Sequence, residues 1–393
     1  MDTADVVIVG GGIIGSAVAY FLSTDASVRG RRIVLAERDP SYAEASTARS
    51  AGGLRQQFST PENIAMSQVT LELFRKLRTM FGPDADVSFR EQGYLILSTD
   101  AGRQGLSDNV QLQRSHGAGI VLLDAAQLAQ RFPWLSTEGL AAGAFGESGE
   151  GWFDPPSFAA LLRKAAVARG VQLIPDRVTA IAVEQGRARN VTLASGRSIA
   201  CGAVVNAAGP WAGEIASLAG LQLPVEPRKR FVYVLDCRDA SDALRLAPLT
   251  VDPSGIWFRP EGRMFLCGKS PDGQDEPVDG DLGLVDHDFF EREVWPVLAA
   301  RVPTFESVKV TSSWAGFYDY NTLDQNAVIG PHPDVPNVYF ANGFSGHGAQ
   351  QGAAAGRAVA ELIVHGRFQT IDLTRLGYQR IVDGTPVRER NVI

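Results

Sequence analysis

The feature that most constrains the fold is a glycine motif between an apolar run and a helical run near the N-terminus. Residues 5–9 are apolar and mostly β-branched, which predicts a buried parallel strand. The motif Gly10-x-Gly12-x-x-Gly15 follows at once, and residues 16–22 favour a helix. Residues 32–37 form a second strand-like run that ends in the acid Glu37. Together these elements predict a βαβ unit that binds a dinucleotide.

Each glycine of the motif has a physical reason. Gly10 permits a tight turn, Gly12 lets backbone approach a pyrophosphate, and Gly15 lets the helix pack closely on the strand. The pyrophosphate then rests on the helix N-terminus, where free N–H groups favour an anion. Glu37 stands 22 residues after Gly15, where an acid binds the adenosine ribose and disfavours NADP. The motif alone does not separate FAD from NAD.

Composition limits the alternatives. The chain has 393 residues, enough for roughly two or three domains. Its net charge of −7 argues against a nucleic-acid partner. The three cysteines have no metal-ligand spacing, and we expect no metal site. No apolar run reaches the about 20 residues of a transmembrane helix, and no signal or Arg-rich transit segment precedes the first strand, so we expect a cytoplasmic protein.

Four further segments carry a resemblance to a known family. They are STARSAGG at 46–53, NAAGPW at 206–211, TLDQNAVIG at 322–330 and NGFSGHG at 342–348. In this order they resemble the D-amino-acid oxidase superfamily of flavoproteins, in its sarcosine oxidase, glycine oxidase and dimethylglycine dehydrogenase branch. GGLRQQFS at 52–59 is similar to a mitochondrial group of FAD-dependent oxidoreductases that act as respiratory complex I assembly factors. Without a transit segment, the chain is expected to be a bacterial relative.

The resemblance implies FAD and a fold of both α/β and α+β character. We expect a Rossmann-type FAD-binding domain interleaved with a smaller antiparallel-sheet substrate domain. The expected FAD-binding domain is discontinuous, and the substrate domain lies between its parts. The boundaries are 1–85, 150–222 and 318–385 for the FAD-binding domain, and 86–149 and 223–317 for the substrate domain.

The resemblance also implies which residues contact the cofactor. The loop from Gly343 to Gly348 should wrap the flavin pyrimidine edge with backbone N–H groups, which stabilise negative charge on the reduced ring. Val178 should hold the adenine through its backbone. His347 more often fills a packing position in such a loop than acts as a base. Beyond Gly10, Gly12, Gly15 and Glu37, the expected contacts are Ile13, Ile14, Arg38, Ser46, Arg49, Ser50, Ala51, Gly52, Gly53, Val178, Ala208, Gly209, Trp211, Gly316, Gly343, Phe344, Ser345, Gly346, His347, Gly348, Ala349 and Gln350.

Three departures from the family pattern matter. Gly316 falls near a cysteine that attaches the flavin in monomeric sarcosine oxidase, so we expect non-covalent FAD. Phe58 and Gln350 stand near the arginine and lysine that bind the substrate carboxylate there. The oxygen-activating lysine of that relative aligns near residues 265–266, with Lys269 a few positions on. The electron acceptor, oxygen or another compound, is therefore left open.

The expected reaction is oxidation of the C–N bond of a small secondary or N-methylated amine or amino acid. Hydride passes to flavin N5, and the imine product hydrolyses in water. Arg259 is the expected carboxylate anchor, because a buried guanidinium can bind a carboxylate bidentately. The expected catalytic residues are Arg55, Arg259, Lys269, Tyr318, Tyr320 and His347, and Gln56, Phe58 and Trp257 are further candidates for the pocket wall.

Two alternatives stay open: a flavin-binding assembly protein with little turnover, and an FAD dehydrogenase of a non-amine substrate. The oligomeric state is also open.

Overall fold

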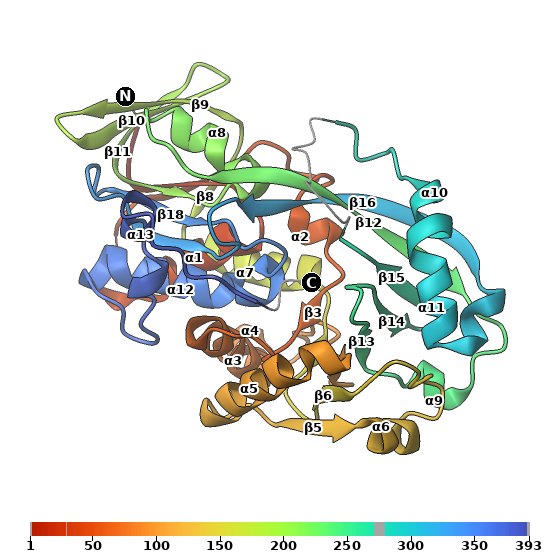
Figure 1. The fold of residues 1–393 in the computed structure, drawn as a ribbon. Helices are drawn as coiled ribbons and strands as arrows, with labels where there is room; N and C mark the ends of the chain where they lie inside the picture. The colour runs from red at the N-terminus through yellow and green to blue at the C-terminus, as the bar shows by residue number, and fades with distance from the viewer. Residues whose placement is uncertain (1, 29, 271–279, 391–393) are drawn as a thin grey trace.

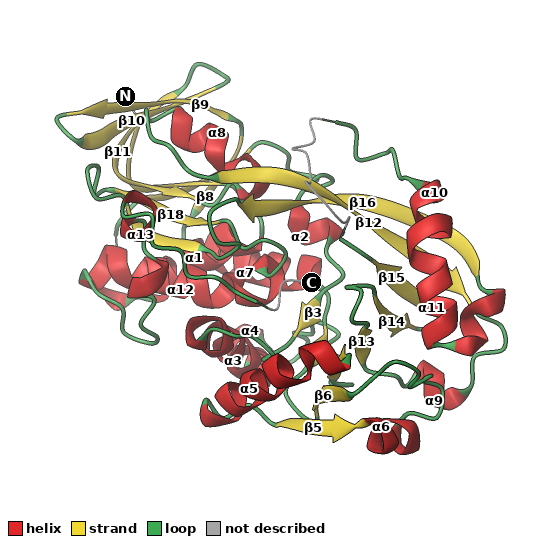
Figure 2. Cartoon of the chain, viewed as in Figure 1, coloured by secondary structure: helices red, strands yellow, loops and turns green. Residues whose placement is uncertain are grey.

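Two eight-stranded sheets organise the chain (Figure 1). They are seen in a computed structural model that describes residues 2–28, 30–270 and 280–390. Figure 2 shows the helices gathered beside the first sheet and along one side of the second.

The first sheet has the strand order β17-β18-β11-β1-β2-β8, with the hairpin β9–β10 added to β11. β1 pairs in parallel with both β2 and β11, so that Val7 lies between Val34 and Val204. The central residues of these strands, 6–9, 33–36 and 203–205, are apolar and buried because both faces of the sheet are covered there. The bounds are β1 (Asp2–Val9), β2 (Ile33–Glu37), β8 (Gln172–Pro175), β9 (Val178–Glu184), β10 (Arg187–Leu193), β11 (Ser198–Asn206), β17 (Val328–Pro331) and β18 (Val338–Asn342).

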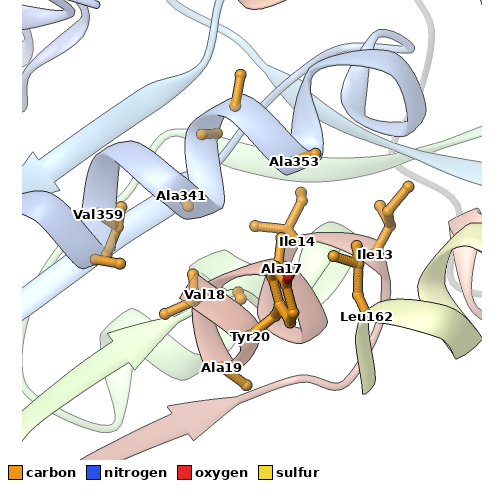
Figure 3. Packing of buried hydrophobic residues seen from close by; sticks show 14 of the residues in the cluster. Ile13, Ile14, Ala17, Val18, Ala19, Tyr20, Leu162, Ala341, Ala353 and Val359 are labelled. Atoms are coloured by element: carbon orange, nitrogen blue, oxygen red, sulfur yellow. The ribbon is translucent and has the colours of Figure 1, made fainter. Parts of the chain in front are cut away.

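Three helices cover one face of this sheet: α1 (Ile13–Thr24), α7 (Pro155–Ala168) and α12 (Gly348–His365). The hairpin β9–β10 and α8 (Ala212–Ser217) pack against the other face. Figure 3 shows Ile14 of α1 directed toward α12, and Ile13 beside Leu162 of α7. Gly352 and Gly356 allow α12 to approach α1 closely: a Cβ on Gly356 would lie 2.5 Å from the Cβ of Ala17.

The second sheet has the order β16-β12-β15-β14-β13-β4-β6-β5 and is antiparallel except where β13 meets β4. One face packs on α10 (His287–Phe289), the π-helical segment η4 (Phe290–Val294) and α11 (Trp295–Arg301). The strand bounds are β4 (Tyr94–Ser98), β5 (Ile120–Asp124), β6 (Ala142–Gly146), β12 (Val225–Asp236), β13 (Leu249–Val251), β14 (Trp257–Glu261), β15 (Met264–Gly268) and β16 (Lys309–Asn321).

Shorter elements connect the two sheets. β3 (Gly53–Leu54) and β7 (Gly151–Trp152) form a two-stranded sheet. In the sequence, β3 lies between β2 and β4, and β7 lies between β6 and β8. The remaining helices are α2 (Ser46–Arg49), α3 (Pro61–Arg75), α4 (Leu77–Phe81), α5 (Arg103–Ser115), α6 (Ala125–Arg131), α9 (Asp242–Arg245) and α13 (Gln379–Val382), with short 3-10 turns at Ala26–Val28, Asp100–Gly102, Gly209–Trp211, Pro303–Ser307 and Thr374–Leu376.

The expected fold class is confirmed: a mainly parallel α/β sheet is interleaved with a largely antiparallel one. The domain boundaries stay a prediction, and β16 runs across one of them, at residues 317 and 318. The helical stretch from Pro61 to Phe81 is divided between α3 and α4 at Lys76. The last long helix, α12, begins at Gly348, directly after the glycine loop.

Candidate cofactor and substrate cavity

A cavity of about 540 Å³ runs from the carboxyl ends of β1 and β2 to the wall formed by β12 and β16. Ligands in open α/β sheets bind at this end of the strands. Most of the expected cofactor residues line it: Gly10, Gly12, Ile13, Ile14, Glu37, Arg38, Ser46, Arg49, Ser50, Ala51, Gly52, Gly53, Val178, Ala208, Gly209, Trp211, Gly316, Gly346, His347, Gly348, Ala349 and Gln350. Gly15, Gly343, Phe344 and Ser345 are the expected cofactor residues that do not contribute to this lining.

The nucleotide end is built from the start of α1. Gly12 occupies the N-cap, and the first turn carries no acidic side chain, so its N–H groups favour an anion. Gly15 packs behind the turn instead of lining the cavity, since a Cβ there would lie 1.8 Å from the Gly10 carbonyl oxygen. The Glu37 carboxylate is oriented by the Gly11 N–H, at 2.6 Å, and by the Asp39 N–H, at 2.8 Å.

The glycine loop before α12 differs from the expectation. The Gly343 and Phe344 N–H groups donate to Oδ2 of Asp319 at 2.9 and 3.1 Å, and the Ser345 N–H donates to the Asp319 carbonyl oxygen at 3.1 Å. These three donors are therefore engaged within the protein. The lining part of the loop is Gly346 to Gly348, and α12 continues it with Ala349 in its first turn.

Asp319 is a site residue that sequence reasoning missed. It lines the cavity from β16, and burial raises the pKa of its carboxyl to about 6, against the opposing effect of the two loop N–H donors. Its neighbours Tyr318 and Tyr320 were expected site residues, but nothing in the sequence showed that Asp319 between them holds a loop more than 20 residues away.

Arg55 and His347 form the centre of the cavity wall. The Arg55 guanidinium, 2% exposed, donates from Nη2 to Nε2 of His347 at 3.1 Å and lies 4.0 Å over the Phe58 ring. Because arginine has no acceptor, Nε2 carries the lone pair and the proton sits on Nδ1. Burial, with the Arg55 charge, lowers the pKa of His347 well below its usual value. His347 is thus neutral, and Nε2 is not available as a base.

A second missed residue, Glu150, lies behind Arg55. Its carboxylate, fully buried, accepts the Gln56 N–H at 2.5 Å and the Gln57 Nε2–H at 2.8 Å. Burial raises the pKa of Glu150 to about 7, and these hydrogen bonds oppose the shift. A single acid before a glycine gave no signal in the sequence. The Gln350 side chain also holds the backbone of this loop, because its Oε1 accepts the Arg55 N–H at 2.8 Å.

Arg230 is the cation that the sequence reading overlooked. In the run Arg228-Lys229-Arg230, β12 alternates: Lys229 donates to the carbonyl of Asp281, whereas the side chain of Arg230 is buried at the cavity. Arg230 lies 5.1 Å over the ring of Tyr318, which lines the same wall. The period of a strand places residues two apart on one face, so a short basic run can include an inward arginine.

Comparisons with known proteins agree with this geometry. The DAO family, described as "FAD dependent oxidoreductase", matches residues 5–362. This chain belongs to the DAO family.

The FAD-dependent oxidoreductase domain-containing protein 1 of Xenopus laevis is 42% identical over 100% of this chain and 85% of its own length. Human mitochondrial dimethylglycine dehydrogenase is 26% identical over 95% of this chain, which spans 44% of that protein. The structure of L-proline dehydrogenase from P. horikoshii has a TM-score of 0.85 at 25% identity, covering 98% of this chain and 99% of that one. The family resemblance seen in the sequence is thereby confirmed.

Membership in the DAO family implies FAD, and the described residues fit it. Two long helices, α1 and α12, open their N-termini onto one cavity without side-chain caps of their own. The Arg38 guanidinium stacks 3.5 Å over Trp211 at the nucleotide end, beside Val178. None of the three cysteines, all of them within the described residues, lines the cavity. Ser46 and Arg49 are engaged with β16, donating to the carbonyl oxygens of Phe317 and Ala315.

Three expected catalytic residues of this DAO-family chain have other contacts. Arg259 lies outside the cavity lining and pairs with Glu261, while its Nε donates to the Ala51 carbonyl at 3.1 Å, so its guanidinium is engaged within the protein. Lys269 contributes to the cavity wall, but its Nζ lies 3.8 Å from Oε2 of Glu293 in η4. Tyr320 accepts a hydrogen bond from Gln325 at 2.6 Å outside the lining.

Of the further wall candidates, Trp257 lines the cavity. Gln56 and Phe58 lie behind it, bound to Glu150 and packed under Arg55. Among residues 2–28, 30–270 and 280–390, no group of three acidic, histidine or cysteine side chains could hold a metal ion. Within the same ranges, no helix combines the length and the apolar character needed to cross a bilayer.

Proposed function

We propose that the chain is an FAD-dependent oxidase or dehydrogenase that oxidises the C–N bond of a small secondary or N-methylated amino acid or amine. FAD is held without a covalent bond, which is supported by Gly316 near the position of the flavin-attaching cysteine of monomeric sarcosine oxidase and by the absence of cysteines from the described cavity lining. The observation that carries the proposal is the single cavity that joins the nucleotide end to the wall of Arg230 and Tyr318. A location in the cytoplasm stays a prediction.

Arg230 is the group best placed to bind a substrate carboxylate. It is buried at the cavity, 5.1 Å over the Tyr318 ring, where it also donates to the Ser270 hydroxyl and the Lys229 carbonyl, and a guanidinium matches the geometry of a carboxylate. Two of the similar proteins are named for dimethylglycine and L-proline, both N-substituted amino acids with one carboxylate. Arg230 thus replaces Arg259 as the proposed carboxylate anchor. It would supply the positive charge that is missing at Phe58 and Gln350, the residues near the carboxylate-binding arginine and lysine of monomeric sarcosine oxidase.

The remaining wall favours the reactive form of the amine. Trp257 and Tyr94 supply aromatic surface at this end of the cavity, and a poorly solvated amine prefers its neutral form. Only a neutral amine gives up hydride readily, so no dedicated base is required. Bound FAD would accept the two electrons. The His347–Arg55 pair keeps a neutral imidazole and a fixed positive charge beside the reacting centre.

The test is an anaerobic titration of the purified protein with secondary and N-methylated amino acids, followed in the visible flavin bands. Bleaching by one compound supports the proposal, and admission of air then separates oxidase from dehydrogenase. Flavin that no amine bleaches, but another donor does, would favour a dehydrogenase of a non-amine substrate. Flavin that no donor reduces would favour an assembly protein with little turnover. Flavin released by acid precipitation is the expected sign of non-covalent binding.

A further inference from the structure

The C-terminal segment after α13 returns to the loop beneath the cavity. The Val387 N–H donates to Oδ2 of Asp324 at 2.9 Å, and Asn326 donates to the Val387 carbonyl at 2.9 Å. Asp324 is itself fixed by Arg380, whose Nε lies 2.8 Å from Oδ2 of the buried carboxylate. These contacts hold the backbone of residues 385–390 against the first sheet's domain.

This C-terminal segment carries Glu389, whose carboxylate is buried. The side chain is 4% exposed and receives four hydrogen bonds from the start of α3. Oε1 accepts the N–H and the hydroxyl of Ser59, each at 2.7 Å. Oε2 accepts the Thr60 hydroxyl at 2.9 Å and the Asn63 amide at 3.1 Å. A charge so well satisfied can persist in the interior.

The loop that donates hydrogen bonds to Glu389 is the loop that carries Arg55. Ser59 follows Phe58 directly, and the Phe58 ring supports the Arg55 guanidinium at 4.0 Å. At the other end of the loop, Glu150 accepts the Gln56 N–H. The loop thus lies between two buried carboxylates. Burial lowers the pKa of Arg55, and Tyr94, Glu389 and Glu150 act against this through their charges.

We propose that Glu389 is a positioning residue for Arg55: the C-terminal segment fixes the loop that places the Arg55 guanidinium at the cavity. Glu389 itself does not line the cavity and acts through the loop. The proposal needs bound FAD, which family membership implies, but it does not depend on the amine substrate. Its test therefore stays informative whether or not any amine is oxidised.

The test measures the midpoint potential of FAD in the purified holoprotein by reduction against reference dyes. Reduction adds negative charge to the flavin, and the Arg55 cation stabilises that charge best while Glu389 holds its loop in place. E389Q weakens this hold and is expected to shift the potential to a more negative value, whereas E389D, which keeps a carboxylate for the loop donors, is expected to return it toward that of the wild type. E184Q changes an exposed acid in the hairpin β9–β10 and should leave the potential unchanged. A wild-type potential in folded, FAD-loaded E389Q would overturn the proposal.

A double-mutant cycle separates positioning from a direct effect of charge on the flavin. If Glu389 acts through Arg55, E389Q should shift the potential much less in an R55Q background than in the wild type. Equal shifts in both backgrounds would overturn the positioning role. If E389Q does not accumulate as a folded protein, S59A removes one donor and leaves the charge in place. It should give a smaller shift of the same sign, and no shift would count against the proposal.

Discussion

The two ends of the cavity are built in different ways. At the nucleotide end, the contacts come from backbone: the start of α1, the glycine turn, and a carboxylate held by the N–H groups of Gly11 and Asp39. At the other end, the proposed substrate end, the wall includes side chains from β12 and β16, chiefly Arg230 and Tyr318. A backbone site depends on local conformation, whereas a side-chain wall depends on strand register and on what each neighbour already binds.

The largest effect is expected where the backbone site has no room for a side chain. G15A places a Cβ 1.8 Å from the Gly10 carbonyl oxygen, and that oxygen belongs to the turn itself. The turn must open, so we expect a loss of about 3 kcal/mol or more in unfolding free energy and no retained FAD. Urea unfolding and flavin content measure this. G105A in α5 is the matched control, because nothing lies within 4 Å of its added Cβ. G15A with wild-type flavin content would refute the packing role.

This difference explains how far the sequence could be interpreted. The βαβ unit could be predicted because Gly10, Gly12 and Glu37 act within one local turn, whereas the family and most other residues that line the cavity came from the resemblance. Arg259 was chosen as the anchor for its residue type alone, and the sequence did not show that it lies outside the lining and pairs with Glu261. Asp319 and Glu150 were missed because their partners are distant in sequence, at Gly343 and Gln56.

The next prediction concerns the buried acid behind the substrate end. The pKa of Glu150 is raised from 4.5 to about 7 in the folded state, so its stabilising contribution is complete below pH 4.5 and is lost as the pH rises to about 7. Between about pH 5 and pH 8, wild-type unfolding free energy should fall by about 2 to 3 kcal/mol from this group.

Urea unfolding at several pH values tests this assignment. E150Q should flatten most of the fall, whereas E184Q, at an exposed position, should keep it. Asp319, whose pKa is raised to about 6, acts with the same sign at lower pH and accounts for a residual slope in E150Q. An unchanged slope in E150Q would show that Glu150 is ionised throughout.

Arg230 on β12 and Arg259 on β14 give a direct test of the side-chain wall. R230M should weaken binding of a substrate carboxylate on the order of 30-fold, because a buried guanidinium loses its charged hydrogen bonds to the ligand. R259M should leave that Kd within about twofold and instead lower the unfolding free energy by about 2 kcal/mol, since it breaks the contact with Glu261. Flavin-monitored titration with an N-methylated amino acid gives the Kd. The reverse pattern would restore Arg259 as the anchor.

The smallest expected effect concerns Tyr42 and tests whether a side chain contributes to FAD binding at the nucleotide end. Tyr42 has a positive φ of 57°, a strained conformation for an aromatic residue, and its ring lies under the Arg163 guanidinium at 4.2 Å. Its hydroxyl is buried at the cavity and has no hydrogen-bond partner among the described residues. A Cβ on Gly11 would lie 2.7 Å from that hydroxyl, which places it beside the glycine turn.

We therefore expect Tyr42 to donate to the nucleotide half of FAD. Y42F should weaken FAD binding by about three- to tenfold, the value of one neutral hydrogen bond. Quenching of flavin fluorescence on reconstitution of the apoprotein measures this. Competition with ADP should show the same loss and competition with FMN none, while Y339F, on β18 outside the lining, serves as the control. If Y42F binds FAD and ADP as the wild type does, the backbone alone accounts for this end, and the contrast between the two ends becomes complete.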